Sequence, residues 1–397
     1  MSARPAPVEI TTLASGLRVA TERMPGARSV SAGVWVGVGA RDEPEELAGV
    51  SHFLEHLLFK GTEDRSARQI AESIDRVGGD MNAFTTKEYT AYYTRLPASA
   101  LDLGIEILGD VLSAPALRTD DVESERQVIL EELNLDEDTH DDRVHTLVQA
   151  SLFPDHPLGR ETAGERSTIA AIAPSDVREF FERWYRPAAV VVAAAGALEH
   201  EEVVAAVARH FTAPGGGELP ERVAPLDGVE PGVVQRRSLE QAHLAIGYRG
   251  VRRDDPARAS LEVVNHVLGG GMSSRLFDEI RERRGLAYAV YSSLASYCDT
   301  GSLMIYAGTA PAQAAEVLGL VDRELERLAD DGPTAATVRG WPSTRPITSA
   351  TAAASTAWYS WTVSSTVRSR PRQVSWAPRR AMRLPGSSRP SRYEPTR

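Results

Sequence analysis

Hydrophobic and polar residues alternate with two different periods along most of the chain. Apolar residues stand at every second position from residue 30 to residue 38, which is typical of a strand within residues 29–39. The next segment, residues 46–59, repeats its apolar residues at helical spacing. The same periods predict one or two strands at residues 81–95, a strand at 188–195, and helices at 66–77, 97–112, 120–135, 142–153, 175–185 and 201–211. This mixture predicts an α+β fold.

A second unit follows a proline- and glycine-rich segment at residues 214–232, which predicts a linker. Beyond it the periods predict strands at residues 243–248, 287–296 and 302–308, and helices at 256–268, 273–283 and 311–328. Residues 91–112 also resemble residues 305–325, with Pro97 aligned to Pro311. We therefore expect two related domains, at residues 1–213 and 233–332. A second copy of the whole first unit would extend beyond residue 397, so we expect the second domain to be incomplete.

The last part of the chain, residues 333–397, has a different composition. It holds eleven arginines, no lysine and one acid, and twenty of its 65 residues are serine or threonine. It keeps neither period, so we expect a disordered tail. Two interpretations remain: a basic interaction tail, or a stretch not selected to fold, such as the product of a shifted reading frame. The abrupt change within an expected domain favours the second.

Composition narrows the classes of function. The formal net charge of −11 opposes binding to nucleic acid, because proteins that bind phosphates need a basic face. The longest apolar run, near residues 188–198, is too short to cross a bilayer. Cys298 is the only cysteine and cannot form an intramolecular disulfide, which fits a reducing compartment. We expect a cytoplasmic protein that binds neither nucleic acid nor membranes.

Candidate chemistry appears in the segment SHFLEHLLFKG, which begins at residue 51. On a helix, His52, Glu55 and His56 project from one side, while apolar residues fill nearly the opposite side. Two imidazoles four residues apart can bind one zinc ion, and a carboxylate between them can take a proton from water on that ion. This is the inverted zinc-peptidase order, His-x-x-Glu-His. The alternative is two structural histidines beside a solvated glutamate.

A second candidate lies in the segment ESERQVILEELNLDED. Glu125 and Glu132 are seven residues apart, so their carboxylates lie on one face of the predicted helix. A carboxylate from this helix could complete a zinc site of two histidines and one glutamate. The alternative is an acidic helix surface.

Several motifs together resemble the pitrilysin or insulinase family of zinc metallopeptidases. They are HFLEH, then ERQVILEE with 75 residues between His56 and Glu132, then FPDHPLGR from Phe153, together with GGDMNAFTTKEYTAYY. The sequence is most similar to short bacterial members that resemble the β subunit of mitochondrial processing peptidase, over about residues 8–330. The resemblance implies two related domains, each a mostly antiparallel sheet packed by helices, as in half of that family's clamshell.

The resemblance also implies a role for each residue of the two motifs. His52, His56 and Glu132 would be the ligands of one Zn²⁺ ion per chain. Glu55 would be the general base, and Glu125 would orient a ligand histidine.

Two further pairs of residues are implied to bind substrate. Asn82 and Ala83 would lie on an open strand edge along which an extended peptide pairs; the alternative is an ordinary edge strand. Arg281 and Tyr288 would hold a peptide carbonyl and stabilise its developing oxyanion; the alternative is a surface arginine and a tyrosine at the edge of the core. Family members of this length commonly pair, so this arginine and tyrosine are expected to serve the partner's zinc site.

The function predicted from these motifs is zinc-dependent endopeptidase activity on peptides or unfolded polypeptide segments. Water on the zinc ion, deprotonated by Glu55, would attack the peptide carbonyl. We expect a homodimer, or a heterodimer with a related subunit. The alternatives are a noncatalytic assembly or partner subunit of the same family, and an inactive product with an aberrant C-terminus.

Overall fold

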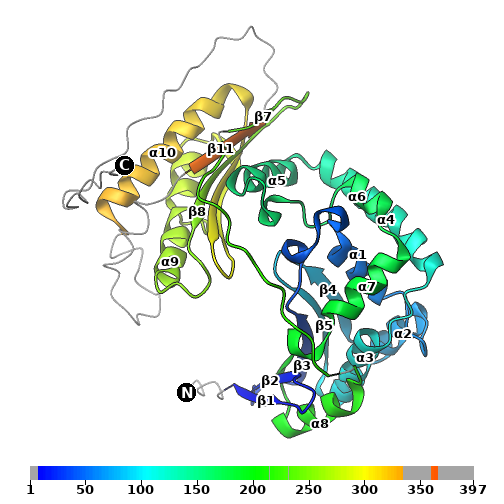
Figure 1. Cartoon of the computed structure of the whole chain (residues 1–397). Helices are drawn as coiled ribbons and strands as arrows, with labels where there is room; N and C mark the ends of the chain where they lie inside the picture. The colour runs from blue at the N-terminus through cyan, green and yellow to red at the C-terminus, as the bar shows by residue number, and fades with distance from the viewer. Residues whose placement is uncertain (1–7, 214, 231, 334–358, 365–397) are drawn as a thin grey trace, which may run out of the picture. The chain divides into compact units, whose positions relative to one another are not determined.

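The computed structural model describes residues 8–213, 215–230, 232–333 and 359–364, and its strands form two sheets (Figure 1). The first sheet has the order β1-β2-β6-β3-β5-β4. Its strands are β1 (Glu9–Thr12), β2 (Arg18–Arg23), β3 (Ser29–Val36), β4 (Asp80–Thr85), β5 (Thr90–Pro97) and β6 (Val190–Gly196). The second sheet has the order β7-β11-β8-β10-β9. Its strands are β7 (Val234–Gln235), β8 (Ala242–Gly250), β9 (Ala287–Ser296), β10 (Gly301–Thr309) and β11 (Tyr359–Ser364).

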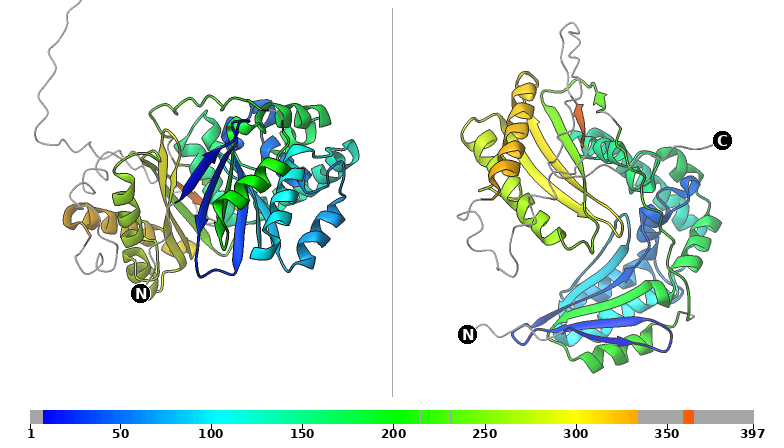
Figure 2. Two further views of the ribbon diagram at one scale, coloured as in Figure 1. Left: turned by 90° about the horizontal axis from the view of Figure 1, so that it is seen from below. Right: turned by 60° about the vertical axis from the view of Figure 1, so that its left-hand side comes forward.

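Helices pack against both sheets, each around its own apolar core. Those of the first domain are α1 (Val50–Leu58), α2 (Ala67–Arg76), α3 (Leu101–Ser113), α4 (Thr119–Asp138), α5 (His140–Leu152), α6 (Arg166–Ala171), α7 (Pro174–Trp184) and α8 (His200–His210). Among them, α5 packs against β8 of the second sheet. Those of the second are α9 (Arg258–Leu268) and α10 (Ala314–Asp331), which lie along the second sheet (Figure 2). No helix among the described residues is long and apolar enough to cross a bilayer.

The two sheets repeat one pattern, which confirms the predicted α+β fold of two related, mostly antiparallel domains. Strands β2, β6, β3, β5 and β4 have the same order and pairing directions as β7, β11, β8, β10 and β9. In both sheets only the first of these pairs is parallel. The aligned prolines also match: Pro97 ends β5 before α3, and Pro311 follows β10 before α10.

Two predicted elements differ in detail from the structure, and in a third the structure decides between two alternatives. The helix expected at residues 46–59 begins only at Val50, because Gly49 has a φ of 97° that breaks the helical path. The one or two strands predicted at residues 81–95 are two strands, β4 and β5. The helix expected at residues 273–283 is a wider π-helix, η6, at Phe277–Glu282.

The prediction of a disordered tail is wrong for six of its residues, Tyr359–Ser364. Strand β11 lies in the segment 333–397, for which no regular structure was expected, and pairs antiparallel with β8. It occupies the position in the second sheet that β6 occupies in the first. The rest of the predicted tail beyond residue 333 lies outside the described residues, so its predicted disorder stays a prediction.

Candidate metal centre

Helix α1 packs with one side and presents the candidate residues from the other. Its fully buried apolar residues include Phe53, Leu54, Leu57 and Leu58. On the other side, His52, Glu55 and His56 remain partly exposed. Helix α1 therefore has the apolar side and the opposite histidine and glutamate side that the sequence predicts.

A buried carboxylate fixes where α1 begins. Both oxygens of Glu43 accept hydrogen bonds from the helix start, one from the Gly49 N–H and one from the Ser51 N–H, each at 2.7 Å. Burial raises the pKa of Glu43 to about 7, although these two hydrogen bonds act in the opposite direction. The carboxylate thus satisfies two of the amides that a helix leaves unpaired at its N-terminus.

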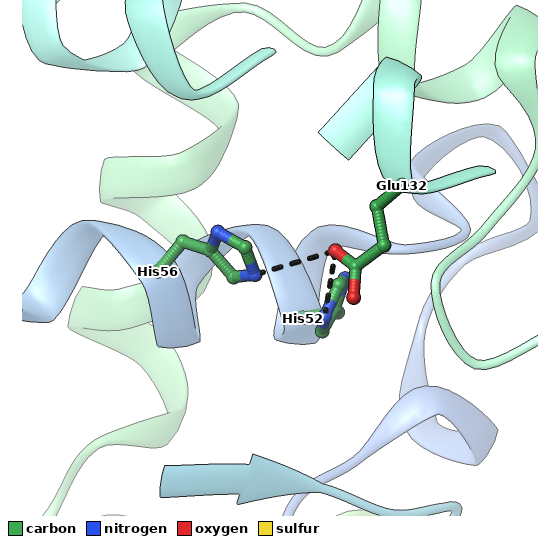
Figure 3. A group of neighbouring side chains, drawn as sticks. All are labelled: His52, His56 and Glu132. Atoms are coloured by element: carbon green, nitrogen blue, oxygen red, sulfur yellow. Dashed lines mark ion pairs between the residues drawn. The ribbon is translucent and has the colours of Figure 1, made fainter. Parts of the chain in front are cut away.

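His52 and His56 converge with Glu132 of helix α4 (Figure 3). Oε2 of Glu132 lies 3.8 Å from Nε2 of His52 and 3.6 Å from Nε2 of His56. Two atoms that bind one zinc ion tetrahedrally at about 2.1 Å are about 3.4 Å apart. Two imidazole nitrogens and one carboxylate oxygen are also donors that zinc prefers. The set therefore fits a zinc ion in donor type and in spacing.

The register of α4 distinguishes two adjacent glutamates. Glu132 faces the two histidines, whereas Glu131 is exposed and accepts a hydrogen bond from Asn134 Nδ2 at 3.2 Å. The residue seven positions after Glu125 is thus the one that joins the histidines.

Glu125, two helical turns before Glu132 on α4, lies behind His56. Its Oε2 accepts a hydrogen bond from Nδ1 of His56 at 3.2 Å, which leaves Nε2 of that ring directed to Glu132. The ammonium of Lys60 forms an ion pair with Oε1 of Glu125. A buried carboxylate is held between an imidazole and a cation, which is the support that metal-binding histidines commonly receive.

The pKa shifts of His52 and Glu55 also suit metal binding and proton transfer. Burial and the neighbouring His56 lower the pKa of His52 to about 4, so at neutral pH its ring is uncharged and has a lone pair to give. Its Nδ1 is buried without a hydrogen-bond partner among the described residues. Burial raises the pKa of Glu55, although its 2.6 Å hydrogen bond from Thr85 Oγ1 and the nearby His56 lower it. A carboxyl with a raised pKa is suited to exchange protons.

Comparison with known proteins shows the family of the chain. Residues 18–166 match the model described as Insulinase (Peptidase family M16), and residues 171–340 match Peptidase M16 inactive domain. An uncharacterized zinc protease of Mycobacterium leprae is 44% identical over 343 residues, which are 85% of this chain and 77% of the relative. The chain belongs to the insulinase (peptidase M16) family.

Other members of the M16 family are similar over the same region. An uncharacterized zinc protease of Streptomyces coelicolor is 44% identical over 82% of this chain and 73% of the relative, and YmxG of Bacillus subtilis, also an uncharacterized zinc protease, is 38% identical over 81% and 79%. Among solved structures, a peptidase M16 inactive domain from Pseudomonas fluorescens superposes with a TM-score of 0.85 at 19% identity, over 92% of this chain and 99% of that chain. That similarity supports the M16 fold.

The residues predicted to bind substrate lie on edge strands. Asn82 and Ala83 are on β4, which among the described strands pairs with β5 alone, so its other edge is open there. Asn82 is exposed, and its Oδ1 accepts a hydrogen bond from the Ala83 N–H at 2.8 Å. Helix α1 packs beside this strand. The predicted peptide-binding edge thus adjoins the candidate metal centre.

Arg281 and Tyr288 lie in the second domain and contact each other. Nη1 of Arg281 donates to the Tyr288 carbonyl at 2.8 Å, and its guanidinium lies 4.9 Å from the centre of the Tyr288 ring. Tyr288 is 80% exposed, on β9 at the edge of the second sheet. The structure pairs these two side chains and does not include them in the cluster of His52, His56 and Glu132. Their role in substrate binding stays a prediction.

Three residues of the centre were not predicted from the sequence. Lys60 had a signal, because it follows His56 by one helical turn. Thr85 and Glu43 had none, because they reach α1 from a neighbouring strand and from the preceding turn through contacts that no local pattern encodes.

Proposed function

We propose that this chain is a zinc-dependent endopeptidase that hydrolyses peptides or unfolded polypeptide segments. The convergence of His52, His56 and Glu132 beside Glu55 carries the proposal. The relatives named as zinc proteases support the metal and the class of reaction.

The proposed zinc site uses one ion per chain. His52, His56 and Glu132 would hold the ion, and Glu125 would keep the His56 ring oriented toward it. Zinc in such a site supplies a Lewis acid that polarises the peptide carbonyl and makes water easier to deprotonate. The neutral state of His52 favours this binding, because a protonated imidazole cannot donate its lone pair to a metal.

Glu55 is the residue that moves the proton. Thr85 holds its Oε2, so we assign Oε1 to proton transfer. The carboxylate takes one proton from the attacking water and gives it to the nitrogen of the scissile bond as the carbon–nitrogen bond breaks. The second proton of the water stays with the new carboxyl group, so the products are a carboxylic acid and an amine; the acid ionises on release, and Glu55 returns to its ionised form.

Substrate would bind as an extended strand along the open edge of β4. Backbone groups near Asn82 and Ala83 would pair with the peptide, which selects an extended conformation rather than a particular sequence. In a homodimer, or in a heterodimer with a related subunit, Arg281 and Tyr288 of one chain would stabilise the oxyanion at the other chain's zinc site. The single cysteine supports the cytoplasm as the place of action.

The test is cleavage of a quenched-fluorescent peptide by the purified, zinc-loaded full chain. Wild type should cleave, and Glu55→Gln should keep its zinc and lose activity by about 10³-fold, since general-base catalysis contributes about 10² to 10⁴. Glu131→Gln, which changes an exposed carboxylate on α4, is the matched control. Zinc binding without cleavage by any variant would contradict the proposed function and favour a noncatalytic family member.

The predicted sharing of sites between two chains has its own test. Glu55→Gln and Arg281→Ala variants are mixed, and their activity is compared with that of each variant alone. Recovery of activity in the mixture would support a shared site. No recovery, in a mixture shown to contain the mixed dimer, would argue against it.

A further inference from the structure

The turn between β4 and β5, residues 86–89, lies directly beside the assigned general base. Thr85, the last residue of β4, donates the hydrogen bond to Glu55. In the turn itself, the Thr86 N–H donates to the Tyr89 carbonyl at 2.9 Å. The position of this turn therefore determines where the Thr85 hydroxyl reaches Glu55.

Glu88 of this turn is buried among cations. Its carboxylate accepts hydrogen bonds from Arg41 Nη1 at 2.8 Å, from Arg253 Nη2 at 2.5 Å and from the Cys298 N–H at 3.0 Å. Only 2% of the side chain is exposed. Burial acts to raise the pKa of Glu88, but the Cys298 hydrogen bond and the charges of Arg222 and Arg253 outweigh it, so the pKa lies below its ordinary value.

Arg41 links this turn to the second domain. Its two terminal nitrogens donate to the two oxygens of Asp299, at 2.8 and 2.5 Å. Its backbone N–H donates to the Lys87 carbonyl at 2.7 Å, which ties it to the turn a second time. Arg222 of the linker pairs with Asp42 at 2.7 Å and donates to the Glu88 carbonyl at 2.8 Å. We name this set of three arginines and three acids the turn latch: Arg41, Asp42, Glu88, Arg222, Arg253 and Asp299.

The latch is a network of balanced charges. Glu88, Cys298 and Asp299 gather their possible ligand atoms within 4.8 Å, as in a metal site. Guanidinium groups already neutralise the two carboxylates, so the cluster has no need of a metal ion. Removing one member of a buried ion pair leaves its partner uncompensated, which makes such networks sensitive to single substitutions.

The residues of the turn latch come from both domains. Arg253 and Asp299 belong to residues 233–332, the domain that matches the model named inactive. Arg253 contacts Glu88 of the turn directly, whereas Asp299 reaches the turn through Arg41. The turn directly follows Thr85, the partner of Glu55. We propose that Asp299 and Arg253 are positioning residues for Glu55, which act through the turn and Thr85; this inference rests on the proposed function.

The test is a double-mutant cycle between Asp299→Asn and Thr85→Val in the zinc-loaded full chain. Each single variant should lower kcat by about fivefold to tenfold, with KM changed by less than about twofold and zinc content unchanged. Because both act on the same hydrogen bond, the double variant should lose little more than the worse single variant. Effects that multiply, or a wild-type kcat in Asp299→Asn, would overturn the inference. Asp299→Glu should restore part of kcat.

A second variant and a measurement that does not depend on activity distinguish a positioning role from a failure to fold. Arg253→Gln is the second variant, because that side chain is half exposed and its loss is compatible with folding. The hydrogen-exchange rate of the backbone amides at residues 80–92 reports on the turn independently of peptide cleavage. Asp299→Asn and Arg253→Gln should speed exchange there and leave the exchange of α2 unchanged. If the wild-type chain fails to cleave the peptide, the proposed function is contradicted, and only the exchange measurement then tests whether the turn latch holds the turn. Unchanged exchange in both variants would overturn it.

Discussion

The two sheet domains share strand order and pairing directions but differ in what their first helix carries. In the first domain, α1 follows β3 and presents His52, Glu55 and His56. In the second, α9 follows β8 and has a single histidine, His266, and one glutamate, Glu262. Within the described ranges, only the first domain joins such residues to a carboxylate from another helix. The comparison teaches that this topology positions a helix beside an edge strand, while a few side chains decide whether a metal centre results.

The largest expected effect comes from removing a candidate metal ligand from the first domain. Glu132→Gln removes the carboxylate ligand, so zinc content should fall and peptide cleavage should decrease by at least about 10³-fold. Glu262→Gln on α9 is the matched control, because it removes an exposed carboxylate from the corresponding helix of the second domain. Metal analysis and peptide cleavage measure both variants. Equal losses in the two would contradict the assignment of the chemistry to the first domain.

The second effect tests whether the second domain contributes to the reaction. Arg281→Ala should lower kcat by about 10²-fold, as loss of an oxyanion donor does, and leave zinc content unchanged. Arg258→Ala, which changes an exposed arginine of α9, provides the control for charge. An unaltered kcat in Arg281→Ala would leave Arg281 and Tyr288 as a surface pair.

A smaller effect is expected behind the metal centre. Lys60→Met removes the cation beside Glu125, which should weaken the hold on His56 and lower zinc affinity by about tenfold. Competition with a zinc chelator measures this affinity. Lys60→Arg keeps the charge and should remain within about threefold of wild type. If Lys60→Met binds zinc as tightly as wild type, the ion pair has no part in the centre.

The smallest effect concerns stability and pH. Glu43 has an ordinary pKa of 4.5 and a folded pKa of about 7, so the folded chain holds this proton to higher pH than the unfolded chain does. Its contribution to stability must therefore fall as pH rises from 4.5 to 7, by about 1 kcal/mol between pH 6 and 7. Urea denaturation of wild type and Glu43→Gln should show this slope only in wild type. Glu46→Gln, in the exposed neighbouring turn, is the control; the same slope in Glu43→Gln would contradict the assignment.

The sequence predicted those features that repeat locally. The helical period around His52 and the spacing from Glu125 to Glu132 were sufficient to place α1 and α4 and the faces that they present. The resemblance to a family selected Glu132 as the third member of the set, and the register of α4 agrees with that choice. Local periodicity encodes such features because it reflects which side of an element is buried.

Other features depend on contacts between distant segments. Nothing near Arg41 indicates that its partner is Asp299, and nothing near Glu43 indicates that its carboxylate caps α1. Strand β11 has the sequence YSWTVS, which alternates apolar and polar residues over only six positions in a tail without a sustained period. So short an alternation does not by itself distinguish a strand from the surrounding tail, and its pairing with β8 is a contact between distant segments, which explains why this strand was missed.

The open edge of β4 has a consequence for solubility as well as for substrate. An unpaired strand edge is a template on which other copies of the same chain can stack. Here the Asn82 side chain occupies the Ala83 N–H, and Asp80 places an exposed carboxylate on the same short strand. A second copy would have to displace an existing hydrogen bond and bring its own carboxylate near this one. Repulsion between two Asp80 carboxylates arises only with a second copy, so the edge is guarded against self-association more strongly than against other extended chains.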